Sequence, residues 1–161
     1  MRSFVPLVIA AAVLAGVGYQ ALTPYFAFGA LLNAAAWNDD IALDRNVDYD
    51  ALRASIASEL RASADGAAAL GGLADAFAQR VSGALAESIA TPEGVRELLG
   101  FGPVSSFAVA DIRALHDRAQ RRYRAWDRFE VTVAEHHLTG SALTYVFERR
   151  GLGWRLTGIS R

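Results

Sequence analysis

The sequence predicts an α+β fold, with an N-terminal membrane helix followed by about four helices packed on a C-terminal antiparallel β-meander. Three observations lead to this prediction. An uncharged apolar run fills most of residues 1–22, apolar side chains recur at helical spacing between residues 23 and 100, and the period changes to two after Tyr123. Residues 1–22 are therefore expected to form a membrane anchor or uncleaved signal segment, and residues 23–161 a single exported domain.

Composition limits the chemistry that this chain can perform. Its 161 residues include no cysteine, which excludes disulfides, thiol nucleophiles, iron–sulfur clusters, cysteine zinc sites and a lipid-modified cysteine anchor. The net charge of −1 argues against nucleic acid as a partner. Residues 101–161 nevertheless hold 10 arginines against 6 acidic residues, which leaves room for a local basic surface.

The first apolar segment, Phe4–Leu22, carries no charge and is long enough to cross a membrane. Its 19 residues would rise about 28 Å as a helix, close to the roughly 30 Å hydrocarbon core of a bilayer. Arg2 precedes it, which favours a cytoplasmic N-terminus. We therefore expect a single-pass membrane protein with its domain on the exported side. The alternative is a signal peptide cleaved near Gly16-Val17-Gly18, which would release the domain on that same side.

A second helix is expected directly after the membrane segment. Thr23 is a good N-cap, and Pro24 suits the first helical position, where its missing N–H is not needed. Residues 25–37 are apolar nearly all round, which is typical of a buried helix. The pair Asp39-Asp40 is expected to end this helix and to cap a short turn after it.

Further helical segments follow before residue 100. Asp48 is placed to cap the first, a break of small residues at 64–72 precedes a longer amphipathic helix, and Thr91-Pro92 begins the last. The expected buried stripes are Tyr49, Leu52, Ile56 and Leu60 in the first helix, and Leu73, Phe77, Val81, Leu85 and Ile89 in the second.

Alternating side chains indicate three strands near the C-terminus. The expected buried face holds Phe129, Val131, Val133, Leu143, Tyr145, Phe147, Trp154 and Leu156, and the expected solvent face holds Glu130, Thr132, Thr144, Glu148, Arg155 and Thr157. Pairing these faces places Val133 opposite Leu143 and Phe147 opposite Trp154, with turns at "HHLTG" and "RRGL". The stretch "VSSFAVAD" is a candidate for a preceding strand.

Five stretches, in this order and spacing, resemble a bacterial family known as domain-of-unknown-function family 2939. They are "TPYFAFGALLNAAAWNDD", "NVDYDALRASI", "ATPEGVRELL", "DRFEVTV" and "FERRGLGWRLTGI", which together span Pro24 to Ile159. The resemblance implies a short exported protein with an N-terminal membrane segment, and it implies no catalytic residues. For a bacterial protein, these features imply an inner-membrane location with the domain on the periplasmic side, or the periplasm if the segment is cleaved. The last stretch is also similar to the final hairpin of cone-shaped domains like nuclear transport factor two, in which a bent sheet wraps a long helix around a pocket.

The histidines and aspartates do not form a recognisable metal site. The pair His136-His137 lies beside Glu135, but the hairpin register places both histidines in a turn, where solvated side chains explain them better. His116 has no carboxylate at ligand spacing. The acidic run of residues 39–50 lacks the glycine and glutamate of a calcium loop, so helix caps explain it better. We expect no metal, no cofactor and no catalytic residue.

One segment, "RALHDRAQRRYRAWDR" at residues 113–128, combines six arginines with aromatic side chains. Arginine beside aromatic rings suits anionic partners such as lipid headgroups or an acidic protein face. A solvated helix leading into an edge strand is the alternative explanation. The expected partner face consists of Arg118, Arg121, Arg122 and Arg124.

The leading hypothesis is a non-enzymatic binding or interaction module, tethered to the membrane by its N-terminal helix and without a nucleic-acid partner. The alternative is a small-ligand pocket between sheet and helices, where a buried carboxylate or histidine would act as an acid or base. Nothing charged projects from the expected pocket face in the predicted register, which favours a packed core there. That face consists of Phe129, Tyr145, Phe147 and Trp154.

Overall fold

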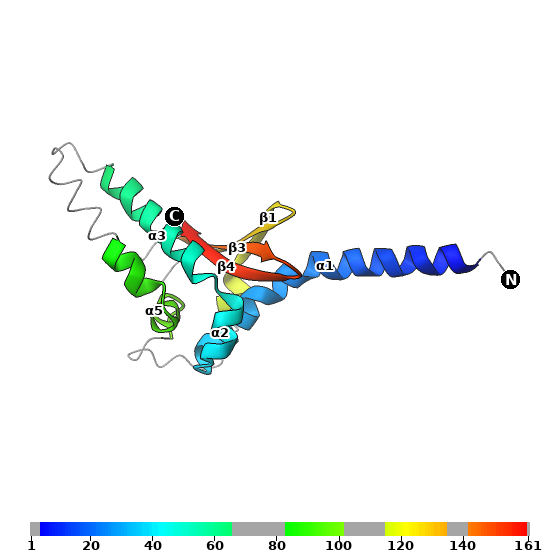
Figure 1. Cartoon of the computed structure of the whole chain (residues 1–161), viewed down its shortest axis with the longest axis horizontal. Coiled ribbons are helices and arrows are strands. Elements are labelled where there is room, and N and C mark those ends of the chain that lie inside the picture. The colour runs from blue at the N-terminus through cyan, green and yellow to red at the C-terminus, as the bar shows by residue number, and fades with distance from the viewer. Residues whose placement is uncertain (1–3, 66–82, 102–114, 135–141, 161) are drawn as a thin grey trace.

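The chain folds as a series of helices followed by an antiparallel sheet (Figure 1). A computed structural model describes residues 4–65, 83–101, 115–134 and 142–160. The helices are α1 (Phe4–Ala36), α2 (Asp40–Asn46), α3 (Tyr49–Asp65) and α5 (Pro92–Leu98), and residues 83–89 and 115–118 are also helical. The strands are β1 (Gln120–Ala125), β2 (Arg128–Val133), β3 (Leu143–Arg150) and β4 (Gly153–Ser160). The predicted α+β fold with a C-terminal antiparallel sheet is confirmed.

The strands form one four-stranded sheet in the order β1-β2-β3-β4, and each neighbouring pair is antiparallel. The predicted pairing of Val133 with Leu143 is confirmed. The sequence did not predict β1 as a strand, because its alternation begins to show only at Tyr123. The candidate for a preceding strand, residues 104–111, lies outside the described residues.

The β3–β4 hairpin has a different register from the predicted one. Phe147 lies opposite Leu156, so the predicted pairing of Phe147 with Trp154 is wrong. The physical reason is Gly151, whose positive φ of 66° permits a tight turn. Because the turn is shorter than predicted, β3 continues to Arg150.

A β-bulge explains why one residue predicted to face solvent is buried. The pairing shifts between Val146 and Phe147, so β4 carries one additional residue at this point. Thr157 occupies that position, where it is buried and its hydroxyl donates a hydrogen bond to the Val146 carbonyl at 3.3 Å. The other residues of the predicted solvent face are exposed or half-buried.

Helix α1 is one continuous helix, although a break at residues 22–23 was predicted. Pro24 lies inside it, where a proline costs about 3 kcal/mol because it removes a backbone hydrogen bond. Here Pro24 is buried, and the Thr23 hydroxyl accepts a hydrogen bond from the Trp154 indole at 3.0 Å instead of capping a new helix. Tertiary packing therefore overrides a local signal that was correct elsewhere: Thr91 does cap α5 by accepting from the Gly94 N–H at 3.0 Å.

A left-handed residue ends α1. Asn38 has a φ of 52° and directly follows the last helical turn. The Asp39 N–H donates to the Ala34 carbonyl at 2.9 Å, and the Asn38 N–H to the Ala35 carbonyl at 3.4 Å, which together form a Schellman motif. Asp39 then caps α2 by accepting a hydrogen bond from the Ala42 N–H at 2.9 Å. The predicted cap is confirmed, whereas Asn38 is what ends the helix.

The core lies between one face of the sheet and the helices. Helix α1 crosses this face, and the ring centroid of Phe28 lies 5.7 Å from that of Tyr145 and 6.3 Å from that of Phe147. The predicted buried face of the sheet is confirmed, because all of its residues are buried: Phe129, Val131, Val133, Leu143, Tyr145, Phe147, Trp154 and Leu156.

In the helices between α1 and the sheet, only some of the residues predicted to form buried stripes are found to be buried. In α3, Leu52 and Ile56 are buried, and the stripe residues on either side pack against the core. In the next predicted helix, the stripe residues before position 83 lie outside the described residues. The prediction for Leu85 is wrong: Leu85 is exposed and its neighbour Ala86 is buried, because residues 83–89 turn an alanine rather than the leucine toward the core.

Helix α3 and the residues before it cover the free edge of β4. The Asp48 N–H donates to the Leu156 carbonyl at 2.9 Å, and Val47 forms a parallel bridge with Leu156. Further along α3, the Ser55 hydroxyl donates to the Ile159 carbonyl at 3.3 Å and accepts from the Ile159 N–H at 3.2 Å. Unpaired strand edges tend to pair with other chains. These contacts satisfy the β4 edge within the chain.

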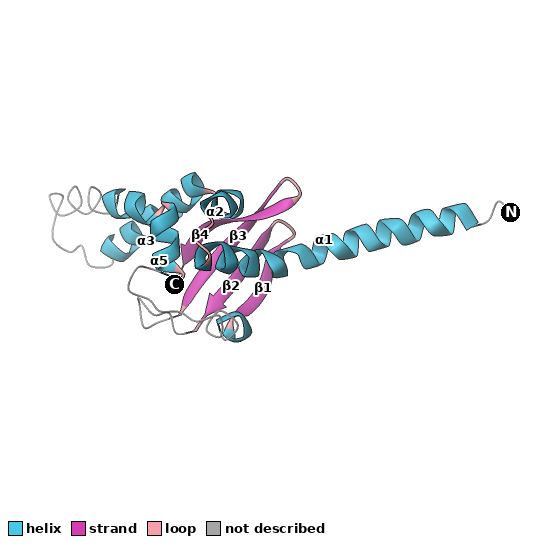
Figure 2. Ribbon diagram, turned by 90° about the horizontal axis from the view of Figure 1, so that it is seen from below, coloured by secondary structure: helices cyan, strands magenta, loops and turns pink. Residues whose placement is uncertain are grey.

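The N-terminal part of α1 extends away from the sheet and the other helices, as both views show (Figures 1 and 2). The side chains of Val8, Leu14 and Leu22 are exposed along it. Among the residues that the structure describes, no helix meets the length and hydrophobicity needed to cross a membrane. The membrane helix expected at Phe4–Leu22 is thus not found among them, and it remains a prediction from the sequence.

Candidate functional site

The predicted partner face is divided between a short helix and the edge strand β1. Arg118 lies at the end of helical residues 115–118, while Arg121, Arg122 and Arg124 lie on β1. Successive residues of a strand point to opposite faces. Arg122 and Arg124 therefore lie on the outer face of the sheet and are exposed, whereas Arg121 lies on the core side and is half-buried.

Arg121 contacts the helix that precedes its own strand. Its guanidinium donates a hydrogen bond to the His116 carbonyl, and its Nε is buried without a hydrogen-bond partner among the described residues. The last carbonyls of a helix lack partners within the helix and are stabilised by a nearby cation. Arg121 thus holds the short helix to the strand, and the exposed face consists of the other three arginines.

Glu130 neutralises part of that exposed face. Its carboxylate accepts a hydrogen bond from Arg124 Nε at 2.5 Å and lies 3.6 Å from Arg128 Nε. Arg122 is directly opposite Glu130 in the sheet, but the side chains of Arg122 and Arg118 make no hydrogen bond or ion pair with any residue in the described part of the chain. An exposed guanidinium in this state keeps its five N–H donors for an external anion.

The four residues of the predicted pocket face belong to a packed aromatic cluster. The ring centroids of Phe129 and Tyr25 lie 5.0 Å apart, and those of Phe129 and Trp154 lie 6.3 Å apart. The Tyr145 hydroxyl donates to the Leu98 carbonyl at 3.2 Å, and burial raises the pKa of Tyr145 well above its ordinary value. The fourth, Phe147, contacts Phe28 of α1 as described above. Other rings occupy the space beside each of these side chains.

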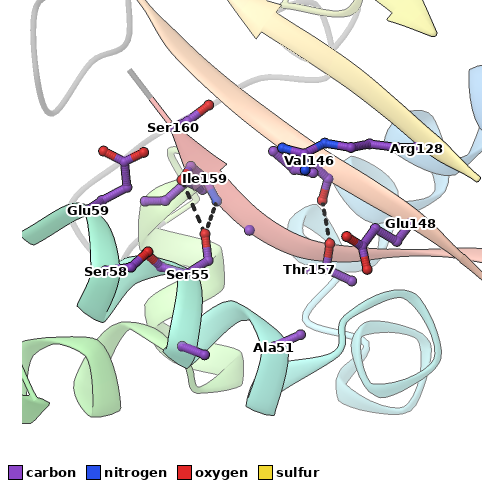
Figure 3. A pocket seen from close by; sticks show the side chains of 12 residues that line it. Ala51, Ser55, Ser58, Glu59, Arg128, Val146, Glu148, Thr157, Ile159 and Ser160 are labelled. Atoms are coloured by element: carbon purple, nitrogen blue, oxygen red, sulfur yellow. Dashed lines mark hydrogen bonds between the residues drawn. The ribbon is translucent and has the colours of Figure 1, made fainter. Parts of the chain in front are cut away.

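A groove of about 500 Å³ lies elsewhere, between α3 and the outer face of the sheet (Figure 3). None of the four predicted pocket residues lines it. The hydroxyls of Ser55 and Thr157 face the groove but already bond to the backbone of β4 and β3. Its charged walls are Glu59, Arg128 and Glu148. The groove could therefore hold a small polar molecule through charged side chains of both signs.

The acidic residues before α3 serve as caps, as predicted, and also as ion-pair partners. The Asp48 carboxylate accepts from the Ala51 N–H at 3.2 Å and from Arg150 Nε at 3.0 Å. Burial alone would raise the pKa of Asp48, but these two interactions outweigh it and hold the pKa below its ordinary value. Asp40 pairs with Arg96 and so connects α2 to α5.

The histidines give no metal site in the part of the chain that the structure describes. His116 Nδ1 lies 3.7 Å from an oxygen of its neighbour Asp117. Within the described ranges, no three side chains of the metal-ligating kinds come together. His136-His137 lies outside those ranges, so the prediction about this pair remains a prediction.

A second cluster, which the sequence pattern does not reveal, lies where two hairpin turns meet. The Arg149 guanidinium is 5.1 Å from the ring centroid of Trp154 and 5.9 Å from that of Trp126. The Arg149 N–H donates to the Asp127 carbonyl at 2.9 Å, which joins the β1–β2 turn to β3. The predicted turn at "RRGL" placed Arg149 in a loop and so hid this contact. The available signal was the meander itself, which brings its first and third turns to the same end of the sheet.

The helical half of the chain matches a known family model. That model is described as a protein of unknown function, DUF2939, and it covers residues 13–98, more than half of the chain. The match includes the first two stretches that carry the resemblance and nearly all of the third. Neither the curated proteins nor the solved structures include a match to this chain. The similarity of the last hairpin to nuclear transport factor two remains a prediction.

Proposed function

We propose that this chain, which belongs to the DUF2939 family, is a membrane-tethered, non-enzymatic interaction module that binds an acidic protein partner along β1. The tether is the uncharged segment Phe4–Leu22, and the domain from Thr23 onward lies on the exported side of the membrane. The projection of the N-terminal part of α1 from the rest of the fold supports a tether, because it leaves this apolar segment without a covering layer (Figure 1).

The observation that carries the proposal is the arginine-bearing edge strand. In the described chain β1 pairs with β2 alone, so its other edge offers backbone N–H and C=O groups. Arg122 and Arg118 add exposed guanidinium groups that have no partner among the residues that the structure describes. A peptide that adds a strand to such an edge is held by backbone hydrogen bonds, while side chains supply specificity. Acidic side chains on that peptide would complement the arginines.

The contrast between the two sheet edges supports the same conclusion. Contacts from Val47, Asp48 and Ser55 occupy the β4 edge, as described above. The β1 edge instead carries charged side chains, which discourage self-association of an exposed strand but tolerate a partner of opposite charge. The aromatic face that could have formed a reactive pocket is packed, which favours an interaction role over catalysis.

Photo-crosslinking tests the proposal directly. A photoreactive residue in place of Ala125, which is exposed at the end of β1, is introduced into the full-length chain in its native membrane. We expect a crosslink to an acidic protein that is lost when Arg118→Gln and Arg122→Gln are combined. The matched control is Arg61→Gln, which neutralises an exposed arginine of α3. A crosslink of equal yield in both variants would contradict the proposed role of β1.

The groove supports a second candidate function, the binding of a small polar molecule. It has walls of both charge signs and opens beside α3 rather than in the core. Native mass spectrometry of the full-length chain, released from mild detergent, would reveal a retained molecule. If the groove binds this molecule, Arg128→Gln lowers the fraction of chains that retain it, whereas Arg61→Gln does not.

A further inference from the structure

We propose that the turns of the β1–β2 and β3–β4 hairpins form a second binding surface, which rests on the anionic headgroups of the membrane. We call this surface the tip surface. It consists of Trp126, Asp127 and Leu152, with Arg149 and Arg150 beside them. The inference rests on the proposed tether and adds to it a site that is separate from the free edge of β1. It assigns to the domain a fixed orientation relative to the bilayer.

The two turns form one surface because side chains and backbone connect them. The Arg149 N–H donates to the Asp127 carbonyl at 2.9 Å. The Arg149 guanidinium lies 5.9 Å from the Trp126 ring and 5.1 Å from the Trp154 ring. Arg150 also ties the second turn to the start of α3, through Asp48 at 3.0 Å. The tip surface is therefore held in place rather than presented on independent loops.

The tip surface lies at the end of the sheet from which the N-terminal part of α1 leaves the domain (Figure 2). The contacts along α1 give the same direction. Trp154, close to the second turn, bonds to Thr23, whereas Phe28 packs deeper in the sheet on Tyr145 and Phe147. Moving along α1 toward Leu22 therefore means moving toward the turns. If Phe4–Leu22 crosses the bilayer, the turns reach the level of its headgroups.

The chemistry of the tip surface suits that level. Trp126 is 75% exposed and Leu152 is 82% exposed, although both are apolar. Tryptophan is enriched at membrane interfaces, where its ring meets the headgroups and the upper acyl chains. Residues 124–128 and 148–155, which form and flank the two turns, together hold five arginines against two acidic residues, which favours contact with anionic lipid. Exposed apolar side chains ringed by arginine match a lipid surface better than an acidic protein, which would leave the leucine and tryptophan in water.

The chain offers a clean test because it contains no cysteine. Full-length Leu152→Cys carries an environment-sensitive fluorophore and is reconstituted into nanodiscs of phosphatidylglycerol and phosphatidylcholine. Trp37→Cys is the control, because Trp37 is 75% exposed but directly follows the end of α1, about 20 Å beyond Thr23 along the helix axis. Circular dichroism establishes that both labelled variants are folded. Flotation with the same lipids measures whether each chain associates with the bilayer at all.

We expect the Leu152 probe to shift to shorter wavelength and to be quenched by headgroup-labelled lipid, while the Trp37 probe remains in water. The shift should shrink when Trp126→Ser is added and when the phosphatidylglycerol is omitted. A chain that fails to float overturns the proposed tether, and this inference falls with it. A chain that floats with both probes in water overturns only the tip surface, and that result would also be expected if an acidic protein were the true occupant.

Discussion

The contact between Ser55 and the edge of β4 provides a quantitative test of how the fold is held together. The Ser55 hydroxyl donates to the Ile159 carbonyl at 3.3 Å and accepts from the Ile159 N–H at 3.2 Å. Ser55→Ala removes both hydrogen bonds while leaving the helix backbone unchanged. The Ile159 N–H is then half-buried without a partner, at the edge that α3 covers.

The size of the effect follows from three contributions. Two long hydrogen bonds contribute about 0.5–1.5 kcal/mol each, and a partly buried N–H left without a partner costs about 1–3 kcal/mol. These two estimates describe the same loss, so they are not added. Alanine regains up to about 0.7 kcal/mol through its better helix propensity. Ser55→Ala should therefore lower the free energy of unfolding by about 1–2 kcal/mol, or roughly 2–8 °C in Tm for a chain of this size.

The assay is thermal unfolding of the full-length chain in mild detergent, followed by near-ultraviolet circular dichroism. Ser58→Ala is the matched control, because Ser58 lies one turn away on α3. Its exposed hydroxyl donates to the Ser55 carbonyl at 2.7 Å rather than to β4. The control should change stability by less than about 0.5 kcal/mol. Equal losses in both variants would show that serine in α3, rather than the β4 edge contact, carries the effect, and would refute the reasoning.

Three further predictions concern the stability of the same folded domain. Gly158→Ala should destabilise by about 1–3 kcal/mol, since its Cβ would lie 2.4 Å from the Ser55 hydroxyl oxygen, and adding Ser55→Gly should cost less Tm in this variant than in the unsubstituted chain, because it also removes the clash. The pKa of Asp48 is lowered, so the stability that its carboxylate contributes is present above pH 3.8 and is lost as the pH falls further. Asp48→Asn, which can still cap α3, should therefore make the free energy of urea unfolding depend less on pH below that value. Phe28→Ala, at a fully buried position against two rings, should cost about 3–5 kcal/mol by urea unfolding.

Features that depend on neighbours in the sequence could be predicted well. Asp39, Asp48 and Thr91 cap helices as expected, because the cap oxygen and its N–H partner lie within three residues of each other. The buried face of the sheet also follows from alternation alone, since the side-chain period of a strand is two. The pairing of Val133 with Leu143 then follows because both strands must turn their apolar faces the same way.

Features that depend on distant residues could not be predicted. The Thr23-Pro24 pair carries the same local signal as Thr91-Pro92, yet the helix continues through it while Trp154, 131 positions away, bonds to the threonine. The β3–β4 register likewise depends on the conformation of Gly151, which the sequence allows but does not require. The first prediction fails because the deciding contact comes from a residue far away in the sequence, and the second fails because a glycine permits several turn conformations and the sequence does not select one of them.

The same difference between local and long-range information applies to the candidate site. The sequence indicates the arginine segment, but only the strand geometry separates the inward Arg121 from the outward Arg122. The tip surface depends on two turns that are close in space and more than twenty residues apart in the chain, so no motif could have revealed it. Its contact residue Arg149 lies in β3 and not in the predicted turn, because one glycine permits a shorter turn.

The proposed tether requires that α1 inserts its N-terminal part into a bilayer and holds the domain in water beside it. Leu14 and Phe26 test this claim as a matched pair, because they are 72% and 70% exposed and lie about 18 Å apart on the same helix. Each is replaced in turn, as Leu14→Cys and Phe26→Cys, and spin-labelled in full-length chain reconstituted into vesicles. If the tether exists, the label at position 14 collides with oxygen dissolved in the lipid, and the label at position 26 collides with a water-soluble nickel complex. Labels that both collide with the nickel complex would contradict it.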